Sequence, residues 1–310
     1  MHCNPEGSFL FSNIKPPRDY GNEKVEGVGS AINWRICPMD VVHNNKIHIA
    51  NMNRISPNLD RKRLKNTSLS ETELSVILGG LLGDGSLKIH PGYKNARYAF
   101  RHSARQSDYF ASKCALLQSI SSPGSVQRQQ PDGWSKQEKL RYCSRALPDL
   151  TTVHSVTHSG NRLTVRRRWL NHLTAQSLAI WWCDDGSLVA NGRRGCISSD
   201  RFSEAECEIL AKYLLVVWGI SVRVGGVQNR SKLPPGFQGP IPSRWRLWFS
   251  TGQLQSFLQI ILPYCPCTAM VYKFKIRYKS AHFQQRWISQ MAALLSPHIS
   301  PGEGGPERMI

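Results

Sequence analysis

Two apolar stretches, about a hundred positions apart, set the pattern of this chain. Residues 77–85 read ILGGLLGDG and residues 178–186 read LAIWWCDDG, so each stretch ends on an acidic residue followed by glycine. A carboxylate at the C-terminal end of a helix is unfavourable, because the helix dipole already places partial negative charge there. Such local conflicts are expected at functional sites, and their repetition predicts that both ends are functional.

Each stretch lies in a predicted helix. Ser70 and Glu73 have the spacing of a capping box, which predicts a helix over residues 71–82. Thr174 can cap the second helix, over residues 175–183. Three glycines weaken the first helix in isolation, but small residues allow two backbones to approach closely. We therefore expect the two helices to pack against each other.

The segments after these helices predict short strands and further helices. Alternation places Arg97 and Arg101 on one face of a strand, opposite Tyr98 and Phe100. The predicted elements of the first half are strands over residues 85–90 and 97–103, a helix over 107–120, strands over 125–129 and 140–145, and a helix over 147–158. Those of the second half are a strand over residues 195–199, a helix over 203–218, strands over 220–225 and 244–250, and a helix over 253–262.

Arginines recur on one face of these strands, and their outward placement predicts a nucleic-acid surface. A β-ribbon fits the major groove of B-DNA, where arginine pairs bidentately with guanine. The candidate DNA-binding residues are Arg97, Arg101, Arg141, Arg145, Arg223, Arg244 and Arg246.

The repeated order of elements predicts an α+β fold of two pseudo-symmetric αββαββα repeats. The repeats pack through their first helices, and their antiparallel sheets form a basic saddle. The predicted domains are an N-terminal extension over residues 1–66, a first repeat over 67–165, a second repeat over 166–282 and a C-terminal tail over 283–310.

Composition favours a nucleic-acid partner. The chain has 40 Lys and Arg against 21 Asp and Glu, a net charge of +19 that attracts polyanions. No apolar run approaches the roughly 18 residues that a bilayer-spanning helix needs, so no membrane partner is expected. The first residues lack the pattern of a secretory signal, and the nine cysteines at irregular spacing fit a reducing compartment.

The two apolar stretches resemble the paired motifs of the LAGLIDADG homing endonucleases, in the single-chain form that carries both copies. The resemblance spans about residues 69–280 and is strongest in the second copy, with its lead-in LTAQSL at residues 173–178. It implies that the catalytic acids are Asp84 and Asp185, each directly before the closing glycine. The preceding position is held by Gly83 in the first copy and by Asp184, a second-choice acid, in the second.

Paired acids of this kind suit a divalent metal. Mg²⁺ uses one or two carboxylates with substrate phosphates and water, and it activates water and stabilises a leaving oxygen. Without a cation, two close carboxylates repel and partly protonate. The predicted metal site comprises Asp84, Asp185, Gly83 and Asp184. The resemblance adds one basic residue near the metal in each half, which corresponds to Lys273 in MVYK and Arg162 in NRLT.

Two functions of different kinds remain open. The first is an intron-encoded, monomeric endonuclease that uses Mg²⁺ to make double-strand breaks at a long site in double-stranded DNA. The second is a maturase that binds its own intron RNA and assists splicing without cutting DNA. Cleavage alone requires both Asp84 and Asp185, and their presence favours the nuclease. The resemblance also implies an organelle genome, with the mitochondrion preferred over the chloroplast.

Overall fold

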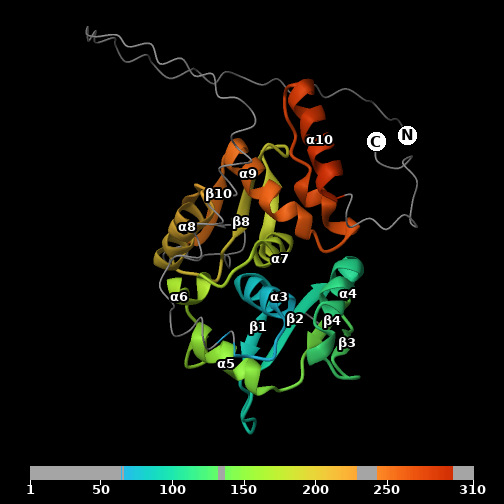
Figure 1. Ribbon diagram of the computed structural model, residues 1–310, viewed down its shortest axis with the longest axis vertical. Coiled ribbons are helices and arrows are strands. Elements are labelled where there is room, and N and C mark those ends of the chain that lie inside the picture. The colour runs from blue at the N-terminus through green and yellow to red at the C-terminus, as the bar shows by residue number, and fades with distance from the viewer. Residues whose placement is uncertain (1–63, 65, 132–136, 229–242, 296–310) are drawn as a thin grey trace, which may run out of the picture. The chain divides into compact units, whose positions relative to one another are not determined.

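The computed structural model describes residues 64, 66–131, 137–228 and 243–295, and both repeats lie in one compact unit (Figure 1). The predicted N-terminal extension, residues 1–66, lies almost entirely outside the described residues, as does the end of the predicted C-terminal tail. The predicted domain boundaries therefore stay predictions.

The two repeats share one order of elements. The first repeat comprises α3 (Glu71–Leu82), β1 (Ser86–Lys88), β2 (Arg97–Ser103), α4 (Ser107–Ala115), β3 (Val126–Gln129), β4 (Lys139–Cys143) and α5 (Pro148–Thr157). The second comprises α7 (Ala175–Asp185), β7 (Gly186–Val189), β8 (Arg194–Ser198), α8 (Glu204–Trp218), β9 (Arg223–Val227), β10 (Arg244–Phe249) and α9 (Thr251–Ile261). Between the repeats lie β5 (His158–Ser159), β6 (Arg162–Leu163) and α6 (Arg167–Leu170). The second repeat is followed by the 3₁₀ segments Leu262–Tyr264 and Thr268–Phe274 and by helix α10 (Ala281–Leu295).

Side-chain caps begin both motif helices, as the sequence predicts. The Ser70 hydroxyl accepts a hydrogen bond from the Glu73 amide at 3.1 Å, and the Glu73 carboxylate accepts one from the Ser70 amide at 2.8 Å. Thr174 and Ser177 form the same reciprocal pair at the start of α7. Each pair satisfies two amides that have no partner within the helix.

Some predicted boundaries differ from the structure. The helix predicted over residues 107–120 ends at Ala115, and a separate 3₁₀ turn, Gln118–Ile120, follows it. The Leu117 amide bonds to Cys114 three residues back, so the chain tightens there instead of continuing as an α-helix. Strand β7 was not predicted, and β9 begins three residues later than the strand predicted over residues 220–225.

The two sheets have matching topology. Their strand orders are β1-β2-β4-β3 and β7-β8-β10-β9, and every neighbouring pair is antiparallel. In the first sheet Arg101 lies opposite Arg141, and Phe100 lies opposite Tyr142. The internal repeat and the predicted α+β class are therefore confirmed.

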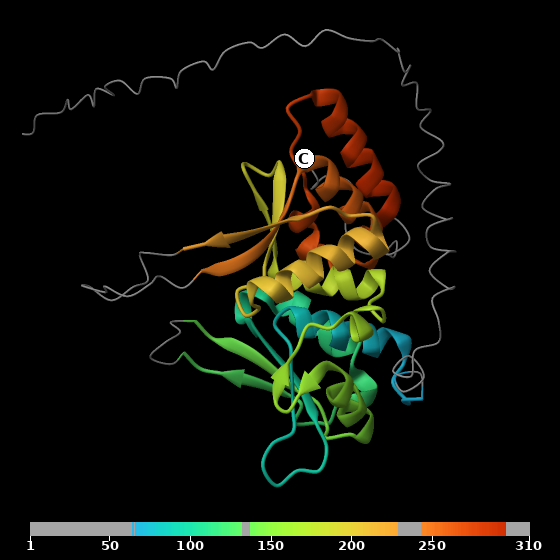
Figure 2. The same cartoon turned by 90° about the vertical axis from the view of Figure 1, so that its left-hand side faces the viewer.

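Helices α3 and α7 lie side by side between the two sheets (Figures 1 and 2). Trp181 and Trp182 of α7 are fully buried, and Trp182 packs edge-on against Phe249 and Phe257 of its own repeat. Both tryptophans therefore belong to the core. Among the described residues no helix is both long and apolar enough to cross a membrane.

The glycines of α3 serve two different contacts. A Cβ on Gly79 would overlap the backbone carbonyl of Ser177, and one on Gly83 would lie 2.5 Å from the Cβ of Asp184, so both permit close approach to α7. Gly80 instead faces the Tyr98 hydroxyl of β2. The prediction of a glycine-lined helix contact is thus right for two of the three glycines and wrong for Gly80.

Candidate active site at the ends of α3 and α7

The close packing of α3 and α7 brings three aspartates together. Asp84 follows Gly83, the C-cap of α3, whereas Asp184 and Asp185 are the last two residues of α7. The Asp84 amide donates a hydrogen bond to Oδ2 of Asp184 at 3.2 Å. The acidic ends of the two helices therefore meet at one place in the molecule.

Asp84 is the most exposed of the three acids. Its side chain is 43% exposed, and its Oδ2 lies 3.4 Å from Nδ1 of His102 on β2. Burial acts to raise its pKa, but the hydrogen bond with His102 and the charges of Lys113 and Lys273 outweigh burial and lower the pKa. Asp84 is therefore ionised at neutral pH.

Asp184 is enclosed instead. Its side chain is fully buried, and Lys113 of α4 donates to both of its oxygens, at 2.9 and 3.1 Å. The Tyr109 hydroxyl donates to Oδ1 at 2.6 Å, which leaves neither oxygen of Asp184 facing solvent. Asp184 lies within the predicted metal site, but its hydrogen-bonding capacity is taken up by the protein.

Asp185 lies in a different environment from its neighbour. Burial, followed by the negative charges of Asp84 and Asp184, raises its pKa to about 8, and the cations of Arg201 and Lys273 offset only part of that rise. Among the described residues its carboxylate has no ion pair. Asp84 and Asp185 are thus close enough for the charge of one to disfavour the charge of the other.

Lys273, predicted from the resemblance to the family, reaches the end of α7. Its Nζ donates to the backbone carbonyls of Cys183 at 2.5 Å and Asp184 at 3.3 Å. Burial lowers its pKa, although the nearby acids oppose that shift. A cation at the C-terminal end of a helix is stabilising, so Lys273 compensates in part for the acids there.

Arg201, which was not predicted, places a second cation at the C-terminal end of α3. The segment after β8 carries it across to the first repeat, where Nη1 donates to the Gly85 carbonyl at 3.3 Å and Nη2 donates to the Leu81 carbonyl. Burial lowers its pKa, against the opposing charges of Asp185 and Asp84. Each motif helix therefore ends on a cation that comes from the second half of the chain.

Arg162, the predicted basic partner of the first half, lies elsewhere on the surface. It belongs to β6, its side chain is 75% exposed, and its ion pair is with Glu206 at 3.6 Å. Among the described residues, Lys113 binds the Asp184 carboxylate, Lys273 binds its backbone carbonyl, and the charge of Arg201 acts on Asp185.

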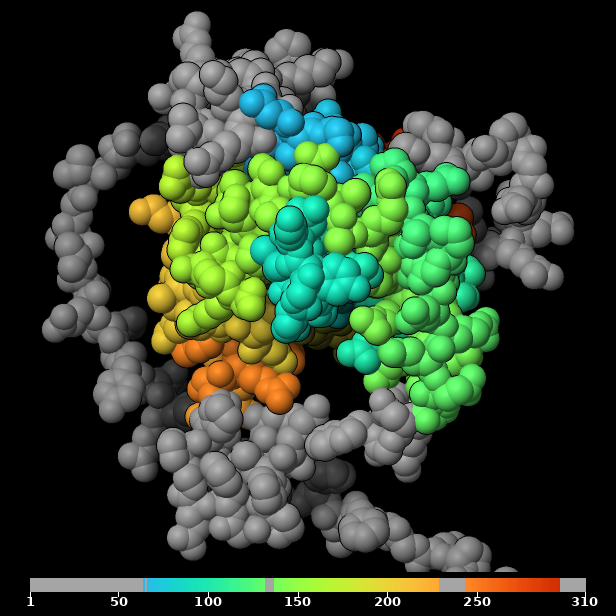
Figure 3. Space-filling model, turned by 90° about the horizontal axis from the view of Figure 1, so that it is seen from below, coloured from blue at the N-terminus to red at the C-terminus, as the bar shows by residue number. Residues whose placement is uncertain are grey.

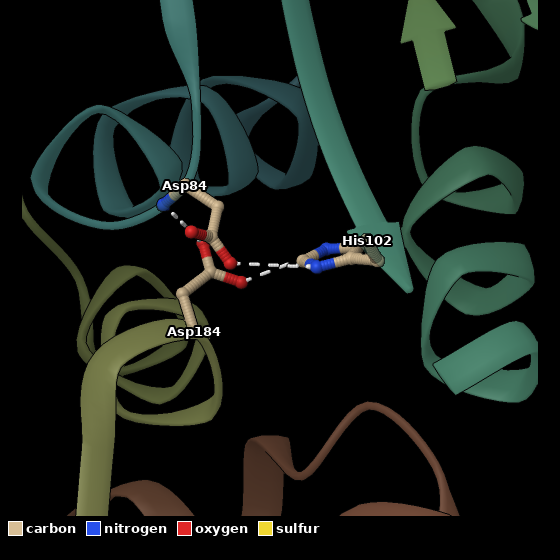
Figure 4. Close-up of side chains that lie close together, drawn as sticks. All are labelled: Asp84, His102 and Asp184. Atoms are coloured by element: carbon tan, nitrogen blue, oxygen red, sulfur yellow. Dashed lines mark hydrogen bonds and ion pairs between the residues drawn. The ribbon is translucent and has the colours of Figure 1, made fainter. Parts of the chain in front are cut away.

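Asp84, His102 and Asp184 each offer one ligand atom, and these atoms lie within 4.8 Å of one another (Figure 4). A group of two carboxylates and an imidazole can hold a divalent metal. Here, however, the Lys113 ammonium lies close to two of them, 2.9 Å from Asp184 and 3.4 Å from Nε2 of His102. Lys113 therefore already places a positive charge beside these ligand atoms, and of the three side chains only that of Asp84 is exposed to solvent.

Comparison with known families agrees with this geometry. Residues 74–234 match the model of the LAGLIDADG DNA endonuclease family. The chain belongs to this family. The match covers both motif helices and most of both sheets, so the resemblance found in the sequence is confirmed.

Two kinds of relative are similar to this LAGLIDADG chain. The protein named RecA from Mycobacterium shimoidei is 27% identical to this chain over 224 residues. The protein of the same name from Mycobacterium gastri is 29% identical over 225 residues. Each match covers 68% of this chain and 48% of the relative. The chain thus spans about half the length of these curated relatives. The homing endonuclease I-WcaI, solved bound to its DNA recognition sequence, is 17% identical with a TM-score of 0.56, over 74% of this chain and 98% of that one, which shows a shared fold.

The first sheet of this LAGLIDADG protein presents three predicted arginines beside Asp84. Arg97, Arg101 and Arg141 line a recess of about 530 Å³ that also contains Asp84. Arg145 lines an adjoining recess of about 550 Å³ with Arg97 and Arg141. An end-on view shows a hollow between green atoms of the first repeat and orange atoms of the second (Figure 3). The structure therefore brings the predicted arginines of the first repeat together next to an acid.

Two of the predicted arginines in the second sheet form ion pairs within the protein. Arg244 and Arg246 on β10 lie 3.2 and 3.7 Å from the carboxylate of Asp200, whereas Arg223 is exposed at the start of β9. Two of the three predicted arginines in this half thus share one counter-ion.

Sequence reasoning missed four residues of the site, namely His102, Lys113, Tyr109 and Arg201. Two of them carried a signal that could have been used. His102 follows Tyr98 and Phe100 on the apolar face of β2, and Lys113 lies at helical spacing from Tyr109 on the buried face of α4. A polar residue on a face that is otherwise apolar marks a buried hydrogen-bonding group.

Proposed function

We propose that this chain is a site-specific endonuclease that makes double-strand breaks in DNA by metal-dependent phosphodiester hydrolysis. One observation carries the proposal: Asp84 and Asp185 lie at the meeting ends of α3 and α7, and Asp84 opens into an arginine-lined recess. Membership of the family supplies the class of reaction, and a relative of the same fold is bound to its DNA recognition sequence. Double-stranded DNA is therefore the proposed substrate.

The donor set fits a hard divalent cation, and Mg²⁺ is the proposed cofactor. Asp84 is exposed and ionised, and its charge helps to raise the pKa of Asp185. This repulsion is relieved when a cation lies between the two carboxylates, and one or two carboxylates are what Mg²⁺ usually takes from a protein. Bound Mg²⁺ supplies an activated water and stabilises the charge that develops on the leaving oxygen.

The remaining residues of the site bind and orient. Arg97, Arg101 and Arg141 place positive charge along the wall of the recess, where DNA phosphates and guanine edges are suitable partners. Lys273 and Arg201 hold the ends of the two motif helices and so keep Asp84 and Asp185 at a fixed separation. One chain carries both repeats and both acids, so the proposed active form is a monomer.

The proposal includes a biological setting, which rests on the resemblance of the sequence. The enzyme is encoded within an intron and cuts the allele that lacks this intron. The proposed compartment is the mitochondrion, with the chloroplast as the alternative.

The test is a cleavage assay on duplex DNA that spans the insertion site with the intron removed. Wild type is expected to cut both strands in Mg²⁺ and to bind without cutting in Ca²⁺. Asp84→Asn and Asp185→Asn are expected to abolish double-strand cleavage and to retain binding. Asp108→Asn, at an exposed acid in the first turn of α4, is the matched control and is expected to cut like wild type.

The same assay separates the second candidate. A maturase would bind the intron RNA and promote its splicing without cutting the duplex. Binding of the RNA with no Mg²⁺-dependent cut in any duplex would replace the endonuclease proposal by the maturase.

A further inference from the structure

A closed ring of polar contacts begins and ends at Asp84. Its carboxylate lies 3.4 Å from Nδ1 of His102, and Nε2 of His102 lies 3.4 Å from the Lys113 ammonium. Lys113 holds Asp184 at 2.9 Å, and Asp184 accepts a hydrogen bond from the Asp84 amide at 3.2 Å. Both the side chain and the backbone of Asp84 are therefore tied to one network (Figure 4).

Each group in this ring can donate or accept as its two neighbours require. The Lys113 ammonium can only donate, so Nε2 of His102 accepts a hydrogen bond from it, and Nδ1 carries the ring hydrogen on the side of Asp84. Asp184 accepts from Lys113 and from the Asp84 amide. Each group thus fixes the next, and the imidazole has one tautomer that satisfies both of its neighbours.

Packing holds the ring in place. The His102 side chain is 2% exposed, and the side chains of Lys113 and Asp184 are fully buried. The His102 ring lies 5.4 Å from the Phe100 ring and 5.0 Å from the Tyr109 ring, and Lys113 lies 4.4 Å above Phe100. Side chains enclosed in this way keep one rotamer, which is what a positioning group requires.

The described residues of the second repeat form no such ring. Leu87 pairs with Tyr98 in the first sheet, and the equivalent Leu188 pairs with Gly195 in the second, which sets the correspondence between the two sheets. Counting along the strands and the following helices places Ser199 at the position of His102, Leu210 at that of Lys113 and Gly83 at that of Asp184. Asp185 therefore lacks the imidazole and the ammonium that restrain Asp84.

We propose that His102, held by Lys113 and Asp184, is a positioning residue that fixes the Asp84 carboxylate, and that cleavage of one DNA strand depends on this ring while cleavage of the other does not. The inference rests on the proposed function and adds to it that Asp84 and Asp185 support cleavage of different strands. It assigns no metal to His102, because the Lys113 ammonium lies against its free nitrogen.

The first test measures the two strands separately, on a duplex that carries a different label at each end. His102→Leu is expected to change the ratio of the two strand-cleavage rates by about tenfold to a hundredfold, since small displacements of a reacting group have effects of this size. Lys113→Met is expected to change the ratio in the same direction. Ser199→Ala and Leu210→Met are the matched controls from the second repeat and should leave the ratio unchanged.

Binding and folding are measured beside cleavage. DNA affinity and melting temperature are determined for every variant, and His102→Asn, which keeps a hydrogen-bond donor, is expected to recover part of the wild-type ratio. If His102→Leu and His102→Asn slow both strands equally, or slow neither, the positioning role is overturned. Absence of any cut by wild type would overturn the proposed function instead, and a second measurement then decides the role of the ring.

That second measurement is Mn²⁺ binding, followed by the paramagnetic resonance of the free ion in the absence of cleavage. His102→Leu is expected to weaken Mn²⁺ binding severalfold because Asp84 loses its orientation, and Lys113→Met is expected to weaken it as well. Tighter Mn²⁺ binding by Lys113→Met would show that Asp84, His102 and Asp184 themselves form a metal site, and would overturn the proposal. Unchanged binding by both variants would also overturn it.

Discussion

The two repeats share a backbone plan but differ at the ends of their motif helices. In the first repeat Asp84 is held by His102, and its pKa is lowered by partners that outweigh burial. In the second, Asp185 has no ion pair among the described residues, and burial raises its pKa to about 8. Two acids in equivalent places on equivalent helices thus have opposite electrostatic environments, because pseudo-symmetry of the backbone does not extend to the side chains around them.

The helix contact itself is also unequal. Helix α3 presents Gly79 and Gly83 to its partner, whereas α7 brings Asp184 and a backbone carbonyl at Ser177 into the space that those glycines leave. Small residues on one helix complement larger groups on the other, which is how close packing is reached between two related but non-identical surfaces. The two motif helices therefore differ both in the surroundings of their acids and in the residues that pack at their contact.

The buried Lys113–Asp184 pair should produce the largest effect on stability. Lys113→Met leaves Asp184 enclosed without its cation, so the free energy of unfolding is expected to fall by about 3 to 5 kcal/mol. Urea unfolding measures the change. Arg128→Met is the matched control, because it removes an exposed ion pair with Glu138 that should contribute less than about 1 kcal/mol.

A double variant sharpens this comparison. Lys113→Met combined with Asp184→Asn removes the uncompensated charge, so part of the lost stability should return. Equal destabilisation by Lys113→Met and Arg128→Met would contradict the burial of the pair.

The glycine contact gives the next largest effect. Gly79→Ala places a Cβ against the Ser177 carbonyl, and the resulting overlap is expected to lower the free energy of unfolding by about 1 to 3 kcal/mol. Gly252→Ala in α9 meets nothing within 4 Å, so the same substitution there should raise stability by up to about 1 kcal/mol. Opposite signs in urea unfolding would locate the effect at the helix contact, and two increases would contradict it.

Much of this asymmetry was beyond the reach of the sequence, although the fold was not. The repeated motif, the capping residues Ser70 and Thr174 and the alternation of arginines with aromatic residues are local patterns, and each predicted an element that the structure confirms. Local patterns determine where an element lies and which face it buries. These local patterns were enough to predict both repeats and the α+β class of the fold.

The partners of the acids depend on contacts between distant parts of the chain. Lys113 meets Asp184 across 71 residues, and Arg201 reaches the Leu81 carbonyl across 120 residues. No short-range pattern encodes such a meeting, and Arg162 was predicted only from the resemblance to the family. The buried positions of His102 and Lys113 could have been read from their apolar faces, but the identity of their partners could not.

The helix caps test the comparison with a smaller effect. Ser70→Ala removes one capping hydrogen bond from α3 and is expected to cost about 1 kcal/mol. Thr174→Ala should cost more, about 2 kcal/mol, because its hydroxyl also lies 2.8 Å from the Ser75 hydroxyl of α3 and so joins the repeats. Thermal or urea unfolding measures both, and Thr174→Ser, which keeps the hydroxyl, should stay close to wild type. Equal costs for the two alanine variants would show that the bond between the repeats adds nothing.

A stacked histidine pair at the end of α5 predicts the smallest effect, a loss of stability in acid. His154 and His158 have ring centroids 4.3 Å apart and are both 8% exposed. Burial, then the charges of His154 and Arg201, lowers the pKa of His158 to about 4. The unfolded chain therefore binds more protons than the folded one between about pH 6.5 and pH 4, so this contribution to stability is lost as pH falls through that range.

The measurement is urea unfolding at pH 7 and pH 4.5 for wild type and His158→Gln. The loss on acidification should be smaller in the variant by about 1 kcal/mol, because glutamine has no proton to gain. Asp185, whose raised pKa acts in the opposite direction over the same range, affects both proteins equally and cancels in the difference. His282→Gln, at an exposed position on α10, is the control and should retain the acid sensitivity of wild type. Identical acid losses in wild type and His158→Gln would show that the stacked pair is already protonated in the folded protein.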